Sequence, residues 1–577
     1  MRRPCKIVLH LFILLFLFTY PVFAQNPASK TGGLDRLERD IDRDKRITDR
    51  IERPREEEEE EGLVKEEKFP IEGEKKTLVR KIEIRGITLI QKRVVDNIIS
   101  EYEGKELTIA QMQKICDLIT DEYRKKGYVT SRAYLPPQTI RDGLLVIMVI
   151  EGRLGSLTIE GNRYFSEPLI RKKIELKPGV VFDYKSLQDS LRRVNEHPDR
   201  RARAILVPGK EPGTTDIVIK VEDRLPVHIG TEFDNFGSRY TEKWRFSAIA
   251  EHNNLLGFDD KFYFKYQKSQ DSLQHFYNFR YIFPLIQNWT DIGFYYVFNK
   301  VRLVKEYKDI GVKGRSTLAG VFISQRLLDD YNIDLRLNGG FDYKRIINIL
   351  GGAEDSKDEP RVFRGGFDLD LTDAWGRTIL TFETDVAVTN FLGGSLKEDV
   401  TASRPGARGD FTKFIAYLYR LQPMPFSSNI LWKNQFQFSN STLFASEQFQ
   451  VGGIVSVRGY PPAEINGDSG YASSIEWSFP ILYYLLPKSV HSTTIPLSET
   501  VYTDAFRFVA FYDFGGVYNN KKLPQERKQK FIHGYGFGVR FNLAEDLSAR
   551  VEFAGPLGSN PSDDRTFRTY FGINKKF

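Results

Sequence analysis

Side chains that carry disulfide, metal or redox chemistry are scarce in this chain. Its 577 residues include 2 cysteines, Cys5 and Cys116, and 7 histidines. Because Cys5 falls in the N-terminal leader described below, the mature chain would carry Cys116 alone and could form no disulfide within one molecule. Cys116 lies on an apolar helical stripe, which predicts a core residue rather than a reactive thiol. The histidines are scattered, so we expect neither a metal site nor a cofactor.

Signature motifs of enzymes and of nucleotide-driven machines are also missing. The sequence contains no G-x-S-x-G nucleophile motif, no H-E-x-x-H zinc motif and no G-x-x-x-x-G-K-[ST] phosphate loop. The formal net charge of +7 is mild for this length and does not indicate a nucleic-acid partner. We therefore expect a protein that is not an enzyme and that binds no nucleic acid.

Long apolar runs are absent after the first residues of the chain. Residues 1–24 have a positively charged start, an apolar run over residues 7–18 and a small-residue cleavage site that ends at Ala24, which predicts a secretory signal peptide. The apolar run is too short for a spanning helix, which needs about 20 residues. The mature protein is therefore either soluble after export or spans a membrane as a β-barrel.

The segment after the leader predicts a helix followed by a tether. Residues 25–53 carry a thin apolar stripe at helical intervals among many charges. The stripe consists of Leu34, Leu37, Ile41, Ile47 and Ile51. Residues 54–76 include six consecutive glutamates at 56–61, a composition typical of a solvated, self-repelling linker. Such a helix cannot build a core alone, so a marginal helix or a disordered tail is the alternative.

Two small α+β modules follow, at residues 77–152 and 153–224. Each predicts the order β-α-α-β-β, and a capping box at Thr108 and Gln111 opens the second helix of the first module. The second module has turn residues that frame a hairpin. These are Asn195, Pro198, Pro208, Gly209 and Asp216.

Residues 225–577 change to segments of about ten residues in which apolar and polar side chains alternate, which is typical of a transmembrane β-barrel. Phe508, Ala510 and Tyr512 alternate with Arg507 and Asp513, for example. The length predicts about 16 antiparallel strands. The chain ends on an aromatic residue, Phe577, which closes the last amphipathic segment.

One loop within this region carries an unusual string. Two glycines at 452–453 precede Val457, Arg458, Gly459 and Tyr460, which indicates a strand that ends in a glycine-flanked loop. An isolated arginine there is usually only a solvated loop charge. However, Phe511, Asp513 and Gly515 lie on a later strand, whose alternation places Asp513 opposite the apolar face. Arg458 and Asp513 are therefore candidates for a charge pair inside a closed β-structure.

Together these strings resemble the POTRA-plus-barrel outer-membrane translocators, and specifically the two-partner secretion transporters of the ShlB/FhaC/HecB (haemolysin secretion/activation) type. Further strings at 234–237, 254–260 and 281–285 occur in the family's order, although Leu255 stands where the family usually has proline. In that family the loop docks on the inner wall of the barrel. The resemblance therefore implies that Arg458 pairs with Asp513, that Gly453 and Gly459 shape the loop, and that Tyr460 anchors it.

The resemblance also implies location and partners. The POTRA modules would lie in the periplasm of a Gram-negative cell, the barrel would span the outer membrane among its lipids, and the helix at 25–53 would act as a removable plug. The partner would be one large secreted passenger, a TpsA-like exoprotein, exported unfolded and without ATP. A C-terminal aromatic such as Phe577 would serve the barrel-assembly machinery as a recognition signal.

Three alternatives remain at this stage. An assembly factor of the same superfamily would insert other outer-membrane proteins, but the two modules, the helix with its tether and the turn string of the second module favour secretion. An outer-membrane lipase or protease is disfavoured by the missing motifs. A simple porin would not need the repeated modules.

Overall fold

The computed structural model describes residues 27–52, 76–487, 505–523, 526–544 and 546–577. The expected signal peptide at 1–24 and nearly all of the expected linker at 54–76 lie outside these residues. The chain divides into two compact units, one formed by residues 76–226 with 256–259 and the other by helix α2 (Pro27–Glu52) with the remaining residues from 227 onward. None of the helices in the described ranges is long and apolar enough to cross a bilayer.

The first module of the smaller unit packs two helices against a three-stranded sheet of order β2-β5-β4. Its elements are β1 (Thr77–Val79), β2 (Lys81–Arg85), α3 (Lys92–Ser100), β3 (Lys105–Leu107), α4 (Ile109–Lys125), β4 (Arg132–Tyr134) and β5 (Leu144–Ile150). The capping box is confirmed, since the Thr108 side chain accepts from the Gln111 amide and the Gln111 side chain accepts from the Thr108 amide. Strand β3 was not predicted, because three residues paired only with β1 are too short to show alternation.

Cys116 confirms the prediction of a core residue. It lies on the inner face of α4 and is fully buried among the apolar side chains of the first module. Burial raises the pKa of its thiol to about 12, because a thiolate would lose its hydration there.

The second module has the same plan, with a sheet of order β6-β8-β7. Its elements are β6 (Arg153–Glu160), α5 (Glu167–Arg171), α6 (Tyr184–Asn195), β7 (Arg200–Pro208) and β8 (Thr214–Asp223). In the three-stranded sheets, β2 runs parallel to β5 and β6 runs parallel to β8, while β5 and β8 also pair antiparallel with β4 and β7. Each sheet therefore has two outer strands that pair with the central strand on one side. The outer edge of β6 is partly covered at its start, where residues 152–154 form backbone hydrogen bonds with residues 179–182.

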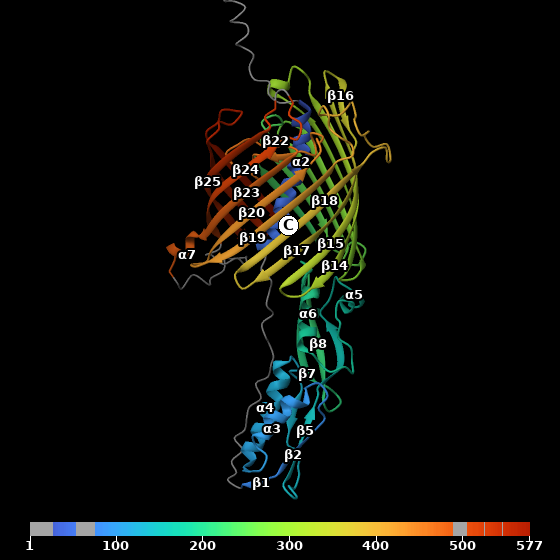
Figure 1. Ribbon diagram of the computed structural model, residues 1–577, viewed down its shortest axis with the longest axis vertical. Coiled ribbons are helices and arrows are strands. Elements are labelled where there is room, and N and C mark those ends of the chain that lie inside the picture. The colour runs from blue at the N-terminus through green and yellow to red at the C-terminus, as the bar shows by residue number, and fades with distance from the viewer. Residues whose placement is uncertain (1–26, 53–75, 488–504, 524–525, 545) are drawn as a thin grey trace, which may run out of the picture. The chain divides into compact units, whose positions relative to one another are not determined.

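The larger unit is a closed antiparallel β-barrel (Figure 1). Its strands are β9 (Val227–Asp234), β10 (Arg245–His252), β11 (Lys261–Ser269), β12 (Gln274–Ile286), β13 (Thr290–Arg302), β14 (Lys313–Asp329), β15 (Ile333–Leu350), β16 (Ala353–Asp358), β17 (Arg361–Asp373), β18 (Gly376–Val388), β19 (Thr412–Met424), β20 (Ser428–Ser439), β23 (Ser469–Pro480), β24 (Phe506–Tyr518), β25 (Gln529–Ala544), β26 (Leu547–Leu557) and β27 (Arg568–Lys576). Short elements in its connections are η1 (Lys305–Tyr307), β21 (Phe449–Val451), β22 (Ile465–Gly467) and α7 (Ile481–Leu485).

The barrel confirms the fold predicted from the sequence. Within the described residues sixteen strands close the ring, while the short β16 pairs only with the end of β15, which itself pairs directly with β17. The last strand, β27, pairs with the first, β9. Beyond β27, the amide of Phe577 donates to the carbonyl oxygen of Ile229 at 2.7 Å, so the terminal residue extends this seam.

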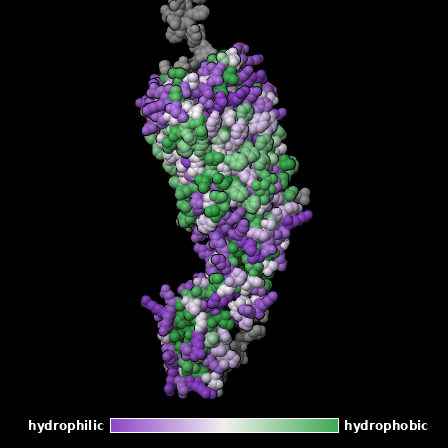
Figure 2. All heavy atoms as spheres, turned by 90° about the vertical axis from the view of Figure 1, so that its right-hand side faces the viewer, coloured by the Kyte–Doolittle hydropathy of each residue, from purple (hydrophilic) through white to green (hydrophobic). Residues whose placement is uncertain are grey.

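Side-chain alternation places apolar groups on the outer face of the barrel and polar groups inside. Tyr512, Tyr535 and Phe537 are exposed, whereas Asp513 and Glu552 are fully buried. On the face seen in Figure 2, hydrophobic atoms form a belt around the middle of the barrel, and hydrophilic atoms gather beyond both of its edges. This pattern matches the lipid-facing band of a transmembrane barrel.

Candidate functional site: an inward loop and a lumen helix

The connection between β20 and β23, residues 440–468, folds into the barrel, and we call it the inward loop. It contains the two-stranded hairpin β21–β22. Val457 and Tyr460 are fully buried and pack in one apolar cluster with residues of the hairpin and of the wall strands. Arg458, between them in the sequence, is 3 % exposed. The loop therefore occupies lumen space and touches the wall.

Arg458 and Asp513 meet inside the barrel. The Arg458 Nε donates to one carboxylate oxygen of Asp513 at 2.8 Å, and Nη2 donates to the other at 2.8 Å. The backbone amide of Arg458 also donates to Asp513 at 3.0 Å. This two-point geometry fixes both the position and the orientation of the guanidinium group.

Further charges surround this pair. The Arg458 Nη1 lies 2.8 Å from Glu476 on β23 and 2.9 Å from Glu552 on β26. A second guanidinium, that of Arg540 on β25, bridges the same two glutamates at 2.9 Å each. Three buried carboxylates thus face two arginines, so removal of either arginine leaves several negative charges confined together.

The wall partners of Arg458 extend beyond those identified from the sequence. The expected Phe511 lies flat against the guanidinium, whose central carbon is 3.3 Å from the ring centroid. Ser474 on β23 accepts from Arg458 Nη2 at 3.0 Å and was not predicted. Glu476, Arg540 and Glu552 were also missed as members of the site, although alternation assigns both Arg540 and Glu552 to the lumen face.

Glycines on the wall make room for the loop backbone. Gly534 is the register partner of Asp513, and a Cβ added there would stand 1.9 Å from the carbonyl oxygen of Arg458. A Cβ at Gly515 would stand 2.5 Å from Val451 of the hairpin. The loop therefore approaches the wall closely at Gly534 and Gly515, where a side chain would collide with it.

Glycines of the loop itself are required for a different reason. Gly453 and Gly459 have φ of +90° and +94°, a region that L side chains rarely adopt. The Gly459 amide donates to the Tyr570 hydroxyl at 3.2 Å. The Tyr460 hydroxyl donates to the carbonyl oxygen of Ser559 at 2.7 Å. The string Val457 to Tyr460 is therefore held at several points besides Arg458.

Helix α2 lies in the lumen, as Figure 1 shows. Its charged side chains bind the polar wall at successive levels. Glu38 accepts from Arg245 at 2.7 Å, Asp42 from Lys265 at 2.8 Å, and Asp44 from the Tyr419 hydroxyl at 2.6 Å, while Arg50 donates to Asp370 at 2.9 Å.

The apolar stripe of α2 also finds partners on the wall. Leu34 and Leu37 pack with Val301 and other residues of the β13–β14 connection, while Ile47 and Ile51 pack with residues of β18 to β20. A cavity of about 310 Å³ remains between the helix, the wall and the inward loop. The helix fills much of the lumen without being tightly packed in it.

Helix α2 and the inward loop are joined directly. Arg36 donates to the carbonyl oxygen of Glu447 at 3.0 Å and to the side chain of Gln437 at 2.9 Å. The Glu447 carboxylate in turn accepts from Lys344 at 2.9 Å and from Lys413 at 2.6 Å. Displacement of the helix would therefore break contacts on the loop segment that precedes Arg458.

The turn residues singled out in the second module have structural roles. The Asn195 side chain exchanges hydrogen bonds with the backbone of Ala202, and the Gly209 amide donates to Thr214 across the β7–β8 turn. Asp216 accepts from the Ser156 amide at 2.6 Å. The carbonyl of Pro198 accepts from Arg224, and Pro208 pairs with Thr215 at the end of β7.

The described residues contain no cluster of three or more His, Cys, Asp or Glu side chains that could hold a metal ion. His197 is buried, lies edge-on to Phe165 and accepts from the Asp199 amide through Nδ1. It therefore serves the packing of its module.

Gly534→Ala is expected to unseat the inward loop while keeping every charge in place. The added methyl group would overlap the Arg458 carbonyl, at a cost of about 1–3 kcal/mol or more. Trypsin added to intact cells should then cleave after Arg458, whereas burial of Arg458 should protect it in the wild type. Gly365→Ala on β17 is the matched control, because an added Cβ there meets nothing within 4 Å. Equal protection of the two variants would contradict the docking geometry.

The family comparison covers most of the chain. Residues 213–541 match the model of the haemolysin secretion/activation protein ShlB/FhaC/HecB. Residues 77–152 match the ShlB-type POTRA domain, and residues 152–224 match the POTRA model described as a surface antigen variable number repeat. The two modules therefore match two different POTRA models.

Individual relatives have low sequence identity to this chain, but each match extends over most of the length of both proteins. The heme/hemopexin transporter protein HuxB of Haemophilus influenzae (strain 86-028NP) is 24% identical over 497 residues, which cover 83% of each chain. The outer membrane transporter CdiB of Dickeya dadantii is 22% identical over 457 residues, or 77% of each chain.

Solved structures share the fold. CdiB from Escherichia coli superposes with a TM-score of 0.70 at 19% identity, over 96% of this chain and 100% of that one. BamA from Haemophilus ducreyi, lacking its first three POTRA domains, gives 0.53 at 14% identity, over 86% and 99%. With a family model matched over more than half of its length, the chain belongs to the ShlB/FhaC/HecB family of haemolysin secretion/activation proteins.

Proposed function

We propose that this protein is an outer-membrane translocator, which exports one large partner exoprotein, unfolded, from the periplasm to the cell surface. The observation that carries the proposal is the pairing of a lumen helix with an inward loop that Arg458 holds on the barrel wall. Both elements occupy the path that an exported chain would follow. A protein whose only task was structural would not need a barrel filled by two separable elements.

The helix α2 acts as a plug that leaves during transport. The polar contacts of Glu38, Asp42, Asp44 and Arg50 are ion pairs or hydrogen bonds to a polar wall, and these can be exchanged for contacts with water. The helix has only a thin apolar stripe, so its removal exposes little apolar surface. The residual cavity of about 310 Å³ gives the helix freedom to begin moving.

The inward loop acts as the latch of the pore. Loss of one partner of a buried pair such as Arg458–Asp513 costs about 3–5 kcal/mol. That cost holds the loop on the wall at rest, with the positive-φ glycines giving its backbone the required shape. Because Arg36 of the helix binds the carbonyl oxygen of Glu447, departure of the helix removes one support of the loop.

The POTRA modules capture the passenger. The outer strands of each sheet can accept an extended client as an added strand. These are β2 and β4 in the first module, and β7 with the part of β6 beyond Leu154 in the second. Main-chain hydrogen bonds formed in this way tolerate many sequences. Folding of the passenger outside the cell would supply the driving force, because no nucleotide motif is present and the outer membrane holds no ATP.

Other partners follow from the same proposal. The apolar belt contacts outer-membrane lipids, and Phe577 serves the barrel-assembly machinery as a signal during biogenesis. The chain acts as a transporter rather than an enzyme and binds no nucleic acid.

Co-expression with a candidate exoprotein, encoded beside this chain, tests the function. We expect protease-accessible passenger outside the cell only when this chain is present. The competing function, insertion of other outer-membrane proteins, predicts instead that depletion of this chain lowers the levels of other barrels while passenger export is unchanged. That second pattern would overturn the proposal.

Arg458→Ala should assemble as a barrel yet weaken or abolish export, because three buried carboxylates would lose a partner and the loop would leave its seat. Asp513→Ala should act similarly. Arg326→Ala is the control, since Arg326 is also a buried lumen arginine and lies 2.8 Å from its carboxylate, Asp334. Export is measured by surface passenger, and barrel assembly by heat-modifiable migration in electrophoresis. Wild-type export by the Asp513 variant would refute the latch.

Tethering the helix should block the pore. Asp42→Cys and Lys265→Cys, joined by a reducible bis-maleimide, would fix α2 to β11. The native Cys116 is fully buried and should not interfere. We expect export and single-channel current to fall on cross-linking and to recover on reduction. Each single-cysteine variant controls for loss of the Asp42–Lys265 ion pair, and undiminished export by the tethered protein would exclude the plug role.

A further inference from the structure

A row of basic side chains crosses four neighbouring strands on the outer face of the barrel. Register places Lys268 of β11 beside His275 of β12, His275 beside Lys300 of β13, and Lys300 beside Arg315 of β14. We call these four residues the basic row. One step nearer the rim, Arg302 stands opposite Lys313.

The basic row faces outward. Lys268, Lys300 and Arg315 are exposed, and residues next to them in sequence, Gln267 and Ser316 for example, are buried in the lumen. This is the alternation of a barrel strand, in which successive side chains point to opposite faces.

The basic row lies at the cell-surface end of the barrel. Strand β9 begins directly after the periplasmic modules, so it runs toward the cell surface and ends there at Asp234. Because the strands are antiparallel, β11 and β13 run the same way and end at Ser269 and Arg302. The row thus faces the outer leaflet.

Carboxylates do not neutralise the basic row within the part of the chain that the structure describes. Lys268, Lys300 and Arg315 have no ion-pair partner among these residues, whereas Arg345 on the next strand pairs with Glu359 at 3.3 Å. Neighbouring strands lie about 4.8 Å apart, and like charges directly opposite each other destabilise a sheet. An anion outside the protein would remove this repulsion.

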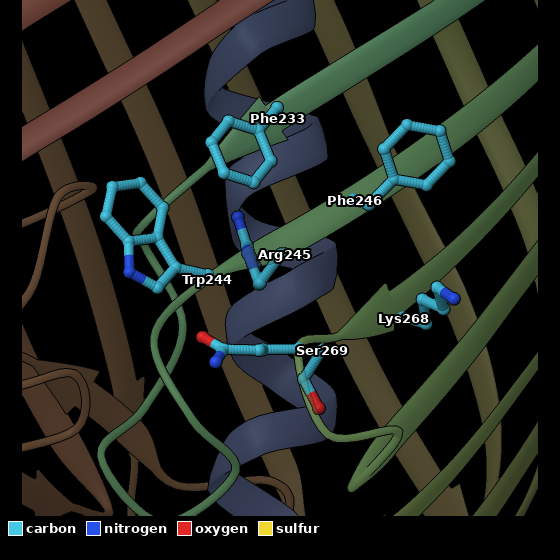
Figure 3. A pocket seen from close by; sticks show the side chains of 7 residues that line it. Phe233, Trp244, Arg245, Phe246, Lys268 and Ser269 are labelled. Atoms are coloured by element: carbon cyan, nitrogen blue, oxygen red, sulfur yellow. The ribbon is translucent and has the colours of Figure 1, made fainter.

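Apolar surface adjoins the basic row. A pocket of about 250 Å³ on the outer wall is lined by Phe233, Trp244, Phe246 and Lys268, among others (Figure 3). Phe233 and Trp244 stack with ring centroids 5.1 Å apart. The pocket therefore presents aromatic faces beside an ammonium group, as a lipid with an anionic headgroup would require.

Other strands carry different exposed side chains at the cell-surface end of the barrel. Exposed side chains near the cell-surface ends of β20, β24, β25 and β26 include the apolar or aromatic residues Phe438, Tyr518, Phe531 and Leu557. The basic row is thus a feature of the β11–β14 sector rather than a general property of this rim.

We propose that the basic row and the adjoining pocket form a binding site for a phosphate-bearing lipid of the leaflet that faces the cell surface. The phosphate binds Lys268, Lys300 and Arg315, with His275 between them, and an acyl chain lies in the pocket against Phe233 and Phe246. Such a lipid supplies the missing negative charge and covers the exposed aromatic rings. The site borders β9, the strand that closes the barrel against β27, so the bound lipid would brace the wall beside the seam.

Binding of lipopolysaccharide to the purified full-length protein in neutral detergent tests the proposal. The probes are radiolabelled lipopolysaccharide, the same lipid after enzymatic dephosphorylation, and inorganic phosphate as a competitor. The wild type should bind the phosphorylated lipid about tenfold more tightly than the dephosphorylated form, and Lys300→Gln with Arg315→Gln should lose about tenfold in affinity.

Two further variants make the test specific. Lys300→Arg with Arg315→Lys keeps the charges and should keep binding. Lys522→Gln with Arg527→Gln removes two exposed charges from the loop at 519–528, at the same end of the barrel, and should bind like the wild type. Unchanged affinity of Lys300→Gln with Arg315→Gln, or an equal loss in the Lys522→Gln with Arg527→Gln control, would overturn the proposal. Full displacement by inorganic phosphate would also overturn it, since a free-phosphate site would remain without a lipid.

Discussion

The buried contact between Arg458 and the carboxylates of the barrel wall is the interaction on which the functional arrangement depends. An ion pair taken out of water gives little net stability, because desolvation offsets most of its Coulomb energy. The pair instead makes separation costly, because each partner would be left as an unpaired charge in a confined space if the loop left the wall. This property makes the pair suitable as a latch: it specifies one seat for the inward loop without adding much to the stability of the barrel.

A polar lumen explains how the helix α2 can be bound inside the barrel. The barrel hides its apolar surface in the membrane and turns polar side chains inward, so anything that fills the lumen must present charges at matching heights. Helix α2 does so with Glu38, Asp42, Asp44 and Arg50 against the wall. The bond from Arg36 to the carbonyl oxygen of Glu447 joins the helix α2 and the inward loop into one network. In the transport function proposed above, a passenger that displaces the helix would therefore weaken the seat of the loop.

The inner and outer faces of the barrel wall contact different surroundings. Inside, alternating charges hold the helix α2 and the inward loop. Outside, an apolar belt meets the lipid, and the basic row lies on β11 to β14. Because no carboxylate pairs with Lys268, Lys300 or Arg315 within the described residues, the phosphate-bearing lipid proposed above would supply the opposite charge.

The sequence alone determined the fold class and the family, and it made Arg458 and Asp513, 55 positions apart, candidates for a charge pair. Alternation with a period of two is local, so it identified the barrel strands and placed Asp513, Arg540 and Glu552 on the lumen face. The turn residues of the second module and the string Val457–Tyr460 indicated the family. Only the tertiary structure decided that Glu476, Arg540 and Glu552 gather at Arg458, which wall residues hold the helix, and that Lys268, His275, Lys300 and Arg315 stand in one row. The physical reason is common to all three: these neighbours depend on the register and stagger between strands, which closure of the barrel sets and no local pattern encodes.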